Sequence, residues 1–268
     1  MLGTMKRAML VVGLCVGLAA CQNNGGGDDY PIGGGGGGGV SSGGGGGSDG
    51  GIDAATGDAG TPIAGRVCLL SDLRQIGVTA SCSTTKAGGL IVTLGNRTAT
   101  TAVDGKFTIN APAGSGLIWR VTGDGKAAGT VQLQPSVMPF GTDATIPAIT
   151  TDDYTNLLSQ NSMTVTDQEG AVIVRVLKNG AAATGVTATS SPQAQRLALY
   201  DSSSAVTWSD AVTGTSTKGI VWFANLPLNA TPPTNATISV KETSTSTPVG
   251  VTALVENQSI TFVTEELQ

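Results

Sequence analysis

Histidine is absent from all 268 residues of the chain, which limits the chemistry that the sequence can perform. Serine and cysteine nucleophile systems that rely on a histidine base are excluded, and so are most catalytic zinc sites. Residues Ser83 to Lys86 match the S-x-x-K motif, in which a lysine takes the proton of an attacking serine. Enzymes with that motif place it at the start of a buried helix and add a K-T-G strand, which this sequence lacks. We therefore interpret the match as accidental.

Acidic side chains offer another route to catalysis, because a glycosidase needs only two carboxyl groups at a set separation. The acids within strand-like stretches are Asp201, Asp210, Glu242 and Glu256. Nothing in their spacing pairs them. Residues 123–126 resemble a fragment of a phosphate loop, but Ala127 follows where serine or threonine is required. We expect no catalytic residue and no cofactor, and therefore a protein that is not an enzyme.

Two adjacent aspartates, Asp152 and Asp153, raise the alternative of a calcium site. They stand at the start of the one helical pattern in the chain, Thr150 to Asn161, directly after Thr150 and Thr151. Threonine is a good N-cap, and acidic side chains suit the positive end of a helix dipole. The helix start explains both aspartates, so we expect no metal.

Aromatic side chains are the candidates for ligand binding. A flat platform of tryptophans could stack on sugar rings, but Trp119 and Trp222 lie inside apolar runs, which favours burial. Trp208 has polar neighbours and, together with Tyr200, is the candidate contact for a polysaccharide or peptide. Core packing of Trp208 is the alternative that we favour.

The first twenty residues have the layout of an export signal. Lys6 and Arg7 precede an apolar run of eleven residues, Ala8 to Leu18, whereas a bilayer-spanning helix needs about 20. Leu18-Ala19-Ala20-Cys21 resembles the lipobox of bacterial lipoproteins. This resemblance implies that residues 1–20 are removed and that Cys21 carries the lipid anchor. An ordinary signal peptide that contains a cysteine is the alternative. Gln22 follows the cysteine at the position where an inner-membrane retention signal would often place aspartate. The absence of aspartate there favours the outer membrane.

Residues 21–60 form a glycine-rich linker. Nineteen of the 40 glycines of the chain lie between residues 22 and 60, with almost no apolar side chain to bury. Such a segment is expected to be disordered. Its root-mean-square span as a flexible coil is about 35 Å, so it predicts a tether.

Removing Lys6 and Arg7 changes the formal charge from −5 to −7 and leaves no basic run. Nucleic-acid binding therefore lacks its electrostatic footprint. Export places the chain in an oxidising compartment, where Cys68 and Cys82 are expected to pair, with two free buried thiols as the alternative.

Short strand patterns bounded by turn residues fill the rest of the chain, and they predict an all-β fold. Residues 61–149 and 167–268 repeat one plan, joined by a short helical connector at 150–166. Thr98 to Pro112 in the first half is similar to Thr213 to Pro227 in the second. We predict two β-sandwich domains in tandem, each burying alternate strand residues between two sheets.

The first half carries motifs at 88–94, 100–109 and 111–114, and the second half carries motifs at 179–190, 216–227 and 236–242. These motifs resemble carboxypeptidase regulatory-like domains, which have a transthyretin-like sandwich of the immunoglobulin-like kind. The second half departs from the pattern at Lys218-Gly219, where the turn usually has aspartate or asparagine. The resemblance implies non-catalytic modules. We expect a lipid-anchored exported protein that makes structural or adhesive contacts with envelope proteins or polysaccharide; the alternative is carbohydrate or peptide recognition by the second domain.

Overall fold

The computed structural model describes residues 60–83, 85–112, 117–123, 134–136, 143–164, 166–202, 208–210, 214–229, 234–244 and 247–268. These residues belong to one compact unit, Asp53–Gln268. The expectations for the signal peptide, Cys21 and the glycine-rich tether lie outside them. Within the described part, strands dominate and a single α-helix is present, which confirms the predicted all-β class.

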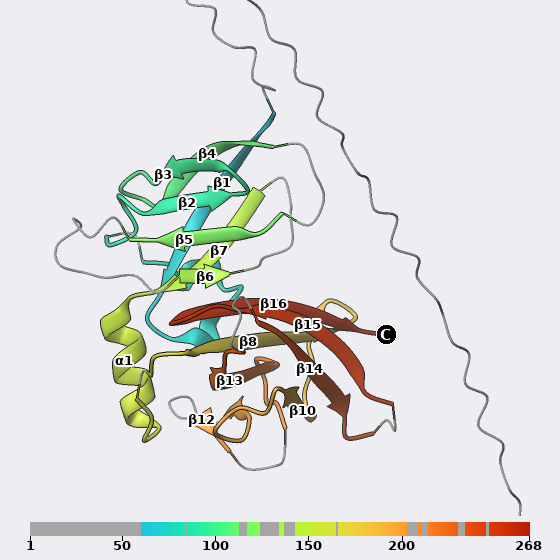
Figure 1. Cartoon of the computed structure of the whole chain (residues 1–268). Helices are drawn as coiled ribbons and strands as arrows, with labels where there is room; N and C mark the ends of the chain where they lie inside the picture. The colour runs from blue at the N-terminus through green and yellow to red at the C-terminus, as the bar shows by residue number, and fades with distance from the viewer. Residues whose placement is uncertain are drawn as a thin grey trace, which may run out of the picture. The chain divides into compact units, whose positions relative to one another are not determined.

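The first half contains two sheets. Its elements are β1 (Thr61–Leu70), η1 (Leu73–Gln75), η2 (Thr79–Ser81), β2 (Ile91–Leu94), β3 (Arg97–Thr100), β4 (Lys106–Ala111), β5 (Trp119–Thr122), β6 (Gln134–Ser136) and β7 (Asp143–Ile149). One sheet has the order β4-β1-β7, in which β1 is antiparallel to β4 and parallel to β7. The other contains β3, β2, β5 and β6 in that order (Figure 1).

The second half repeats this pairing. Its elements are α1 (Thr151–Gln160), β8 (Glu169–Lys178), β9 (Ala181–Ala182), β10 (Val186–Ser191), β11 (Leu199–Asp201), β12 (Trp208–Ser209), β13 (Ile220–Pro227), β14 (Thr234–Glu242), β15 (Val249–Val255) and β16 (Ser259–Leu267). Strand β8 is antiparallel to β13 and parallel to β16, as β1 is to β4 and β7. The facing sheet has the order β10-β14-β15.

Two threonines show that the repeat extends to individual hydrogen bonds. The Thr101 hydroxyl donates to the Ala87 carbonyl at 2.6 Å and accepts from the Leu90 amide at 2.9 Å. Thr215 does the same in the second half: its hydroxyl donates to the Ala183 carbonyl at 2.7 Å and accepts from the Val186 amide at 3.1 Å. Both threonines are buried. The similar sequence stretches therefore adopt the same local structure.

Three clusters of buried apolar side chains fill the space between the sheets. Strand β1 serves two of them, because side chains alternate across a strand. Val67 and Leu69 pack into the core of the first half, whereas Cys68 and Leu70 pack into a shared core with α1, β8, β13 and β16. Strand β8 is likewise buried on both faces, with Ile173 in the shared core and Val174 in the core of the second half.

The two halves also join edge to edge. Strand β6 pairs in parallel with β16, so that strands of both halves belong to one sheet of ten strands (Figure 1). Beside this junction the Arg120 guanidinium forms an ion pair with Glu256, with Nε at 3.2 Å from both carboxylate oxygens. The division into domains at 61–149, 150–166 and 167–268 stays a prediction, because it concerns independent folding. A test of it must separate the two halves at the shared core and at the common sheet.

Helix α1 covers one side of the shared core. It begins as the sequence indicates: Thr150 is the N-cap, and its hydroxyl accepts from the Asp153 amide at 3.1 Å. Leu158 is buried, and Leu157 packs partly against the same core. Within the described residues, no helix is long and apolar enough to cross a membrane.

Cys68 and Cys82 form the predicted disulfide. Both cysteines belong to the shared core, where the bond ties β1 to the segment that follows η2. Their separation of 14 residues corresponds to a stabilisation of about 3 kcal/mol in the chain-entropy model.

Candidate functional site

Asp201, one of the four acids noted in the sequence, is almost completely buried, with 2% of its surface exposed. Its carboxylate accepts three backbone N–H bonds, from Ser216 at 3.1 Å, Lys218 at 2.7 Å and Ile220 at 3.0 Å. In the first half the corresponding turn holds its own acceptor, since Asp104 accepts from the Lys106 amide at 3.2 Å. Asp201 thus supplies from β11 the carboxylate that the Lys218-Gly219 turn lacks.

The other three acids have separate surroundings. Glu242 forms an ion pair with Lys178 at 2.8 Å, and Glu256 forms the ion pair with Arg120. Asp210 is exposed after β12. These residues are not brought together in one site, and the two ion pairs hold carboxylates in structural roles.

Tyr200 and Trp208, the proposed ligand contacts, are both buried, with exposed fractions of 5% and 7%. Tyr200 lies in the core of the second half, where its hydroxyl accepts from the Ala188 amide at 2.9 Å. Trp208 lies in the shared core against Trp222, with ring centroids 5.2 Å apart. The two side chains face different cores, so an exposed aromatic patch made by this pair is ruled out. The burial of Trp208 agrees with the core packing that the sequence analysis favoured, and packing against Trp222 produces this burial although the sequence neighbours of Trp208 are polar.

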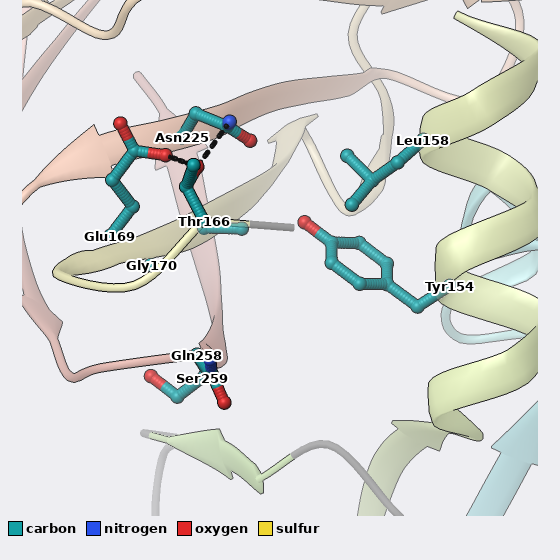
Figure 2. A pocket seen from close by; sticks show the side chains of 9 residues that line it. Tyr154, Leu158, Thr166, Glu169, Gly170, Asn225, Gln258 and Ser259 are labelled. Carbon is teal, nitrogen blue, oxygen red and sulfur yellow. Dashed lines mark hydrogen bonds between the residues drawn. The ribbon is translucent and has the colours of Figure 1, made fainter. Parts of the chain in front are cut away.

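A small hollow lies where α1 meets β8, β13 and the β15–β16 turn. Tyr154 and Leu158 reach it from α1, while Thr166, Glu169 and Asn225 approach from the other side (Figure 2). Glu169 is 7% exposed. One of its carboxylate oxygens accepts from the Thr166 hydroxyl and the other from the Gln195 amide.

The size of this hollow limits its chemistry. Its volume of about 20 Å³ is enough for one water molecule and too small for a substrate. Burial raises the pKa of the Tyr154 hydroxyl well above its usual value, so the group stays protonated. Glu169 has no ion-pair partner among the described residues. The arrangement is a partly buried hydrogen-bond network that ties the segment after α1 to β8, to β13 and to the β10–β11 connection.

Strained backbone surrounds the same hollow. Gln168, Asn225 and Gln258 adopt left-handed conformations, with φ of 67°, 55° and 52°. Asn225 lies within the irregularity of β13, where the register with β8 shifts. Its side-chain amide donates to the Thr166 hydroxyl and to the Thr164 carbonyl, each at 3.1 Å. The sequence gives no signal for this network, because its members come from distant segments.

An open hollow of about 790 Å³ lies at the ends of β14 and β16. Three carboxylates line it, but they do not form a catalytic pair: Glu242 is bound to Lys178, and Glu266 accepts from the Gly180 amide at 2.8 Å. Glu265 has no such partner in the described part of the chain, and burial raises the pKa of its carboxyl above the ordinary value.

A further hollow, of about 340 Å³, is lined by hydroxyl side chains around the Asp201 turn. Its lining includes Ser202, Ser209, Thr215, Ser216 and Thr217. Serine and threonine hydroxyls can both donate and accept hydrogen bonds, as sugar hydroxyls require.

Known families and curated proteins provide no match to this chain. The resemblance to carboxypeptidase regulatory-like domains therefore stays a prediction. Among the residues that the structure describes, no group of three or more acidic or cysteine side chains is arranged to hold a metal ion.

Proposed function

We propose that the chain is a non-enzymatic lipoprotein that displays two β-sandwich modules for structural or adhesive contacts in the cell envelope. Cys21 is the anchor, and the outer membrane is the proposed location. The glycine-rich residues 22–60 would let the modules reach about 35 Å from the membrane. The lipobox-like stretch supports the anchor, and the repeated sheets support the modules.

The proposal that the protein is not an enzyme depends on the hydrogen-bond and ion-pair partners of its acidic side chains. Asp201 accepts three backbone amides, and Glu242 and Glu256 are held in ion pairs. Glu169 faces a hollow that admits only a water molecule. General acid–base catalysis needs a free carboxyl oxygen beside a bound substrate. Asp201 and Glu242 line open hollows, but their oxygens are held by backbone amides and by Lys178.

Recognition of a polysaccharide or peptide by the second half is the second candidate. The hydroxyl-lined hollow at the Asp201 turn favours it. The burial of Tyr200 and Trp208 counts against it, because stacking on a sugar ring requires an exposed aromatic face.

Metabolic labelling with palmitate tests the anchor. We expect label in the full chain and in Cys15→Ser, whose cysteine lies inside the apolar signal run. Cys21→Ser should carry no label and should leave the membrane fraction. Label that persists in Cys21→Ser would remove the anchor and the location together.

A glycan array probed with the purified chain separates the two candidates. The contact role predicts no selective glycan signal. A signal that is lost in Thr217→Lys, at an exposed residue that lines the hydroxyl hollow, would favour recognition instead. Thr237→Lys, also exposed but on β14, is the matched control.

A further inference from the structure

The sheet β10-β14-β15 has two edges, and a sheet edge presents unpaired backbone N–H and C=O groups. The β10 edge is closed at Val186 and Ala188 by residues of the same half. The Tyr200 hydroxyl accepts from the Ala188 amide at 2.9 Å and donates to the Ala188 carbonyl at 3.3 Å. Thr215 bonds both backbone groups of Val186, through its hydroxyl at 3.1 Å and its own amide at 2.9 Å.

These bonds determine which residues of β15 face outward. The backbone N–H and C=O groups of Val186 and Ala188 point away from β14. The backbone groups of the intervening residues of β10 therefore make the hydrogen bonds to β14. Ala188 pairs with Val240, which must therefore bond to its partner on the other side, Val249 of β15. By alternation along β15, the backbone groups of Gly250, Thr252 and Leu254 face away from the sheet.

One bond confirms this assignment independently. The Thr261 hydroxyl of β16 donates to the Leu254 carbonyl, which must therefore point outward. Beyond Leu254 the edge is open: no described residue hydrogen-bonds to the outward groups of Gly250 or Thr252. The open stretch ends at Pro248, which has no N–H to donate.

The composition of β15 leaves this edge unprotected. Val249–Val255 contains no charged residue and no proline, whereas natural proteins usually guard an edge with one or the other. Val249 is among the exposed large apolar side chains, with 38% of its surface accessible. Such an edge is suited to pair with another strand.

We propose that a second copy of this chain pairs with β15 in the antiparallel direction, around a two-fold axis at Val251. The proposal rests on the contact role proposed above and names its partner. In this register Gly250 lies opposite Thr252 of the second copy, and the two residues exchange both backbone bonds. Because the strand is uncharged, no like charges on the two strands oppose each other.

The ends of the open stretch match in the same register. Pro248 of one copy lies opposite Leu254 of the other. The Leu254 amide can donate to the Pro248 carbonyl, while the Leu254 carbonyl is already bound by Thr261 and needs no donor from proline. A shift of the register by two residues would no longer place Pro248 opposite Leu254. The open edge of β15 is therefore complementary to itself in one register only.

Apolar side chains also align. Val249 lies opposite Ala253 of the second copy, and Val251 lies opposite its own equivalent. Val251 and Ala253 already belong to the core of the second half, so pairing extends that core and covers Val249. Contact through one short strand is small, and we expect weak association in solution that anchoring on one membrane would enhance through effective concentration.

The first half already uses the corresponding edge. Strand β6 lies beside β5 as β15 lies beside β14, and each pair is antiparallel. The other edge of β6 pairs with β16 (Figure 1). Strand addition at this position of the module therefore occurs once within the chain, which supports the same use of β15 between chains.

Disulfide cross-linking tests the register. The full chain with Cys15→Ser and Cys21→Ser, kept in mild detergent, is given either Gly250→Cys or Thr252→Cys. Directly opposite residues of an antiparallel bonded pair have Cα atoms about 5.5 Å apart, which suits a disulfide. We expect cross-linked dimers when the two variants are mixed and oxidised, and at least tenfold less when either is oxidised alone.

Thr237→Cys is the matched control, because Thr237 lies directly opposite Thr252 on β14, one strand inside the edge. It should not cross-link with either variant. The proposal is overturned if mixing gives no dimer, if Thr237→Cys cross-links equally, or if each variant cross-links best with itself. Palmitate labelling is independent of this result, so a failure of pairing would leave the anchored display standing, whereas absent labelling would not prevent pairing.

Discussion

Asp201→Asn should destabilise the protein strongly although it changes the side chain by one atom. The two backbone amides bound to Oδ1, from Ser216 and Ile220, can keep an amide oxygen as acceptor. The Lys218 amide, bound to Oδ2 at 2.7 Å, would instead meet the NH2 group of asparagine. This partly buried amide loses its acceptor, and the other two bonds lose the contribution of a charged partner.

The size of the effect follows from these three bonds. A hydrogen bond to a charged group contributes about 1.5–3 kcal/mol, and a charge-assisted bond is about twice as strong as a neutral one. Removal of a buried charge offsets part of the loss. We expect a decrease of about 2–4 kcal/mol in the free energy of unfolding, or roughly 5–15 °C in Tm for a chain of this size.

Urea unfolding followed by tryptophan fluorescence measures this change, since Trp208 and Trp222 lie in the shared core. Asp210→Asn is the matched control: the same substitution at an exposed acid with no hydrogen bond in the described part, expected to change stability by less than about 0.5 kcal/mol. Equal unfolding midpoints for the two variants would refute the role assigned to Asp201.

Three further substitutions probe individual groups. Tyr200→Phe leaves the Ala188 amide without an acceptor at the β10 edge and should cost about 1–3 kcal/mol in urea unfolding; an unchanged midpoint would contradict the edge closure. Thr101→Val and Thr215→Val remove equivalent hydroxyls, and each should lower the free energy of unfolding by about 2 kcal/mol. Unequal losses would show that the two equivalent threonines do not contribute equally to stability. Burial raises the pKa of Glu265, so ionisation of this carboxyl destabilises the fold as the pH rises above the ordinary pKa of 4.5. Glu265→Gln should therefore raise Tm by about 1–2 °C at pH 7 and leave it unchanged at pH 4. A difference in Tm that does not depend on pH would refute this.

Much of the fold could be predicted because its signals are local. Alternating strands, turn glycines and the Thr150 cap depend on neighbours in sequence, and the all-β class, the helix and the disulfide agree with the structure. The similarity of the two halves was also readable, because the same local sequence makes the same turn around Thr101 and Thr215.

The candidate sites were less accessible to prediction. The sequence offered Tyr200 and Trp208 as ligand contacts, with core packing favoured for Trp208, and the structure buries both side chains. The Glu169 network was not anticipated, since Gln195 lies 26 residues from Glu169 and Asn225 lies 59 residues from Thr166 in the chain. The sequence of a strand does not show whether a polar side chain hydrogen-bonds to water or to another segment of the chain.

By itself the sequence determined the chemistry that is excluded, since a chain without histidine cannot build a histidine-based site wherever its strands lie. It also determined the strand pattern, because side-chain alternation is set by the backbone. The tertiary structure alone decided that Asp201 completes the Lys218-Gly219 turn, that Tyr200 closes the β10 edge and that β15 stays open. Each of these depends on a hydrogen-bond partner brought from another strand, and such partners are chosen by packing.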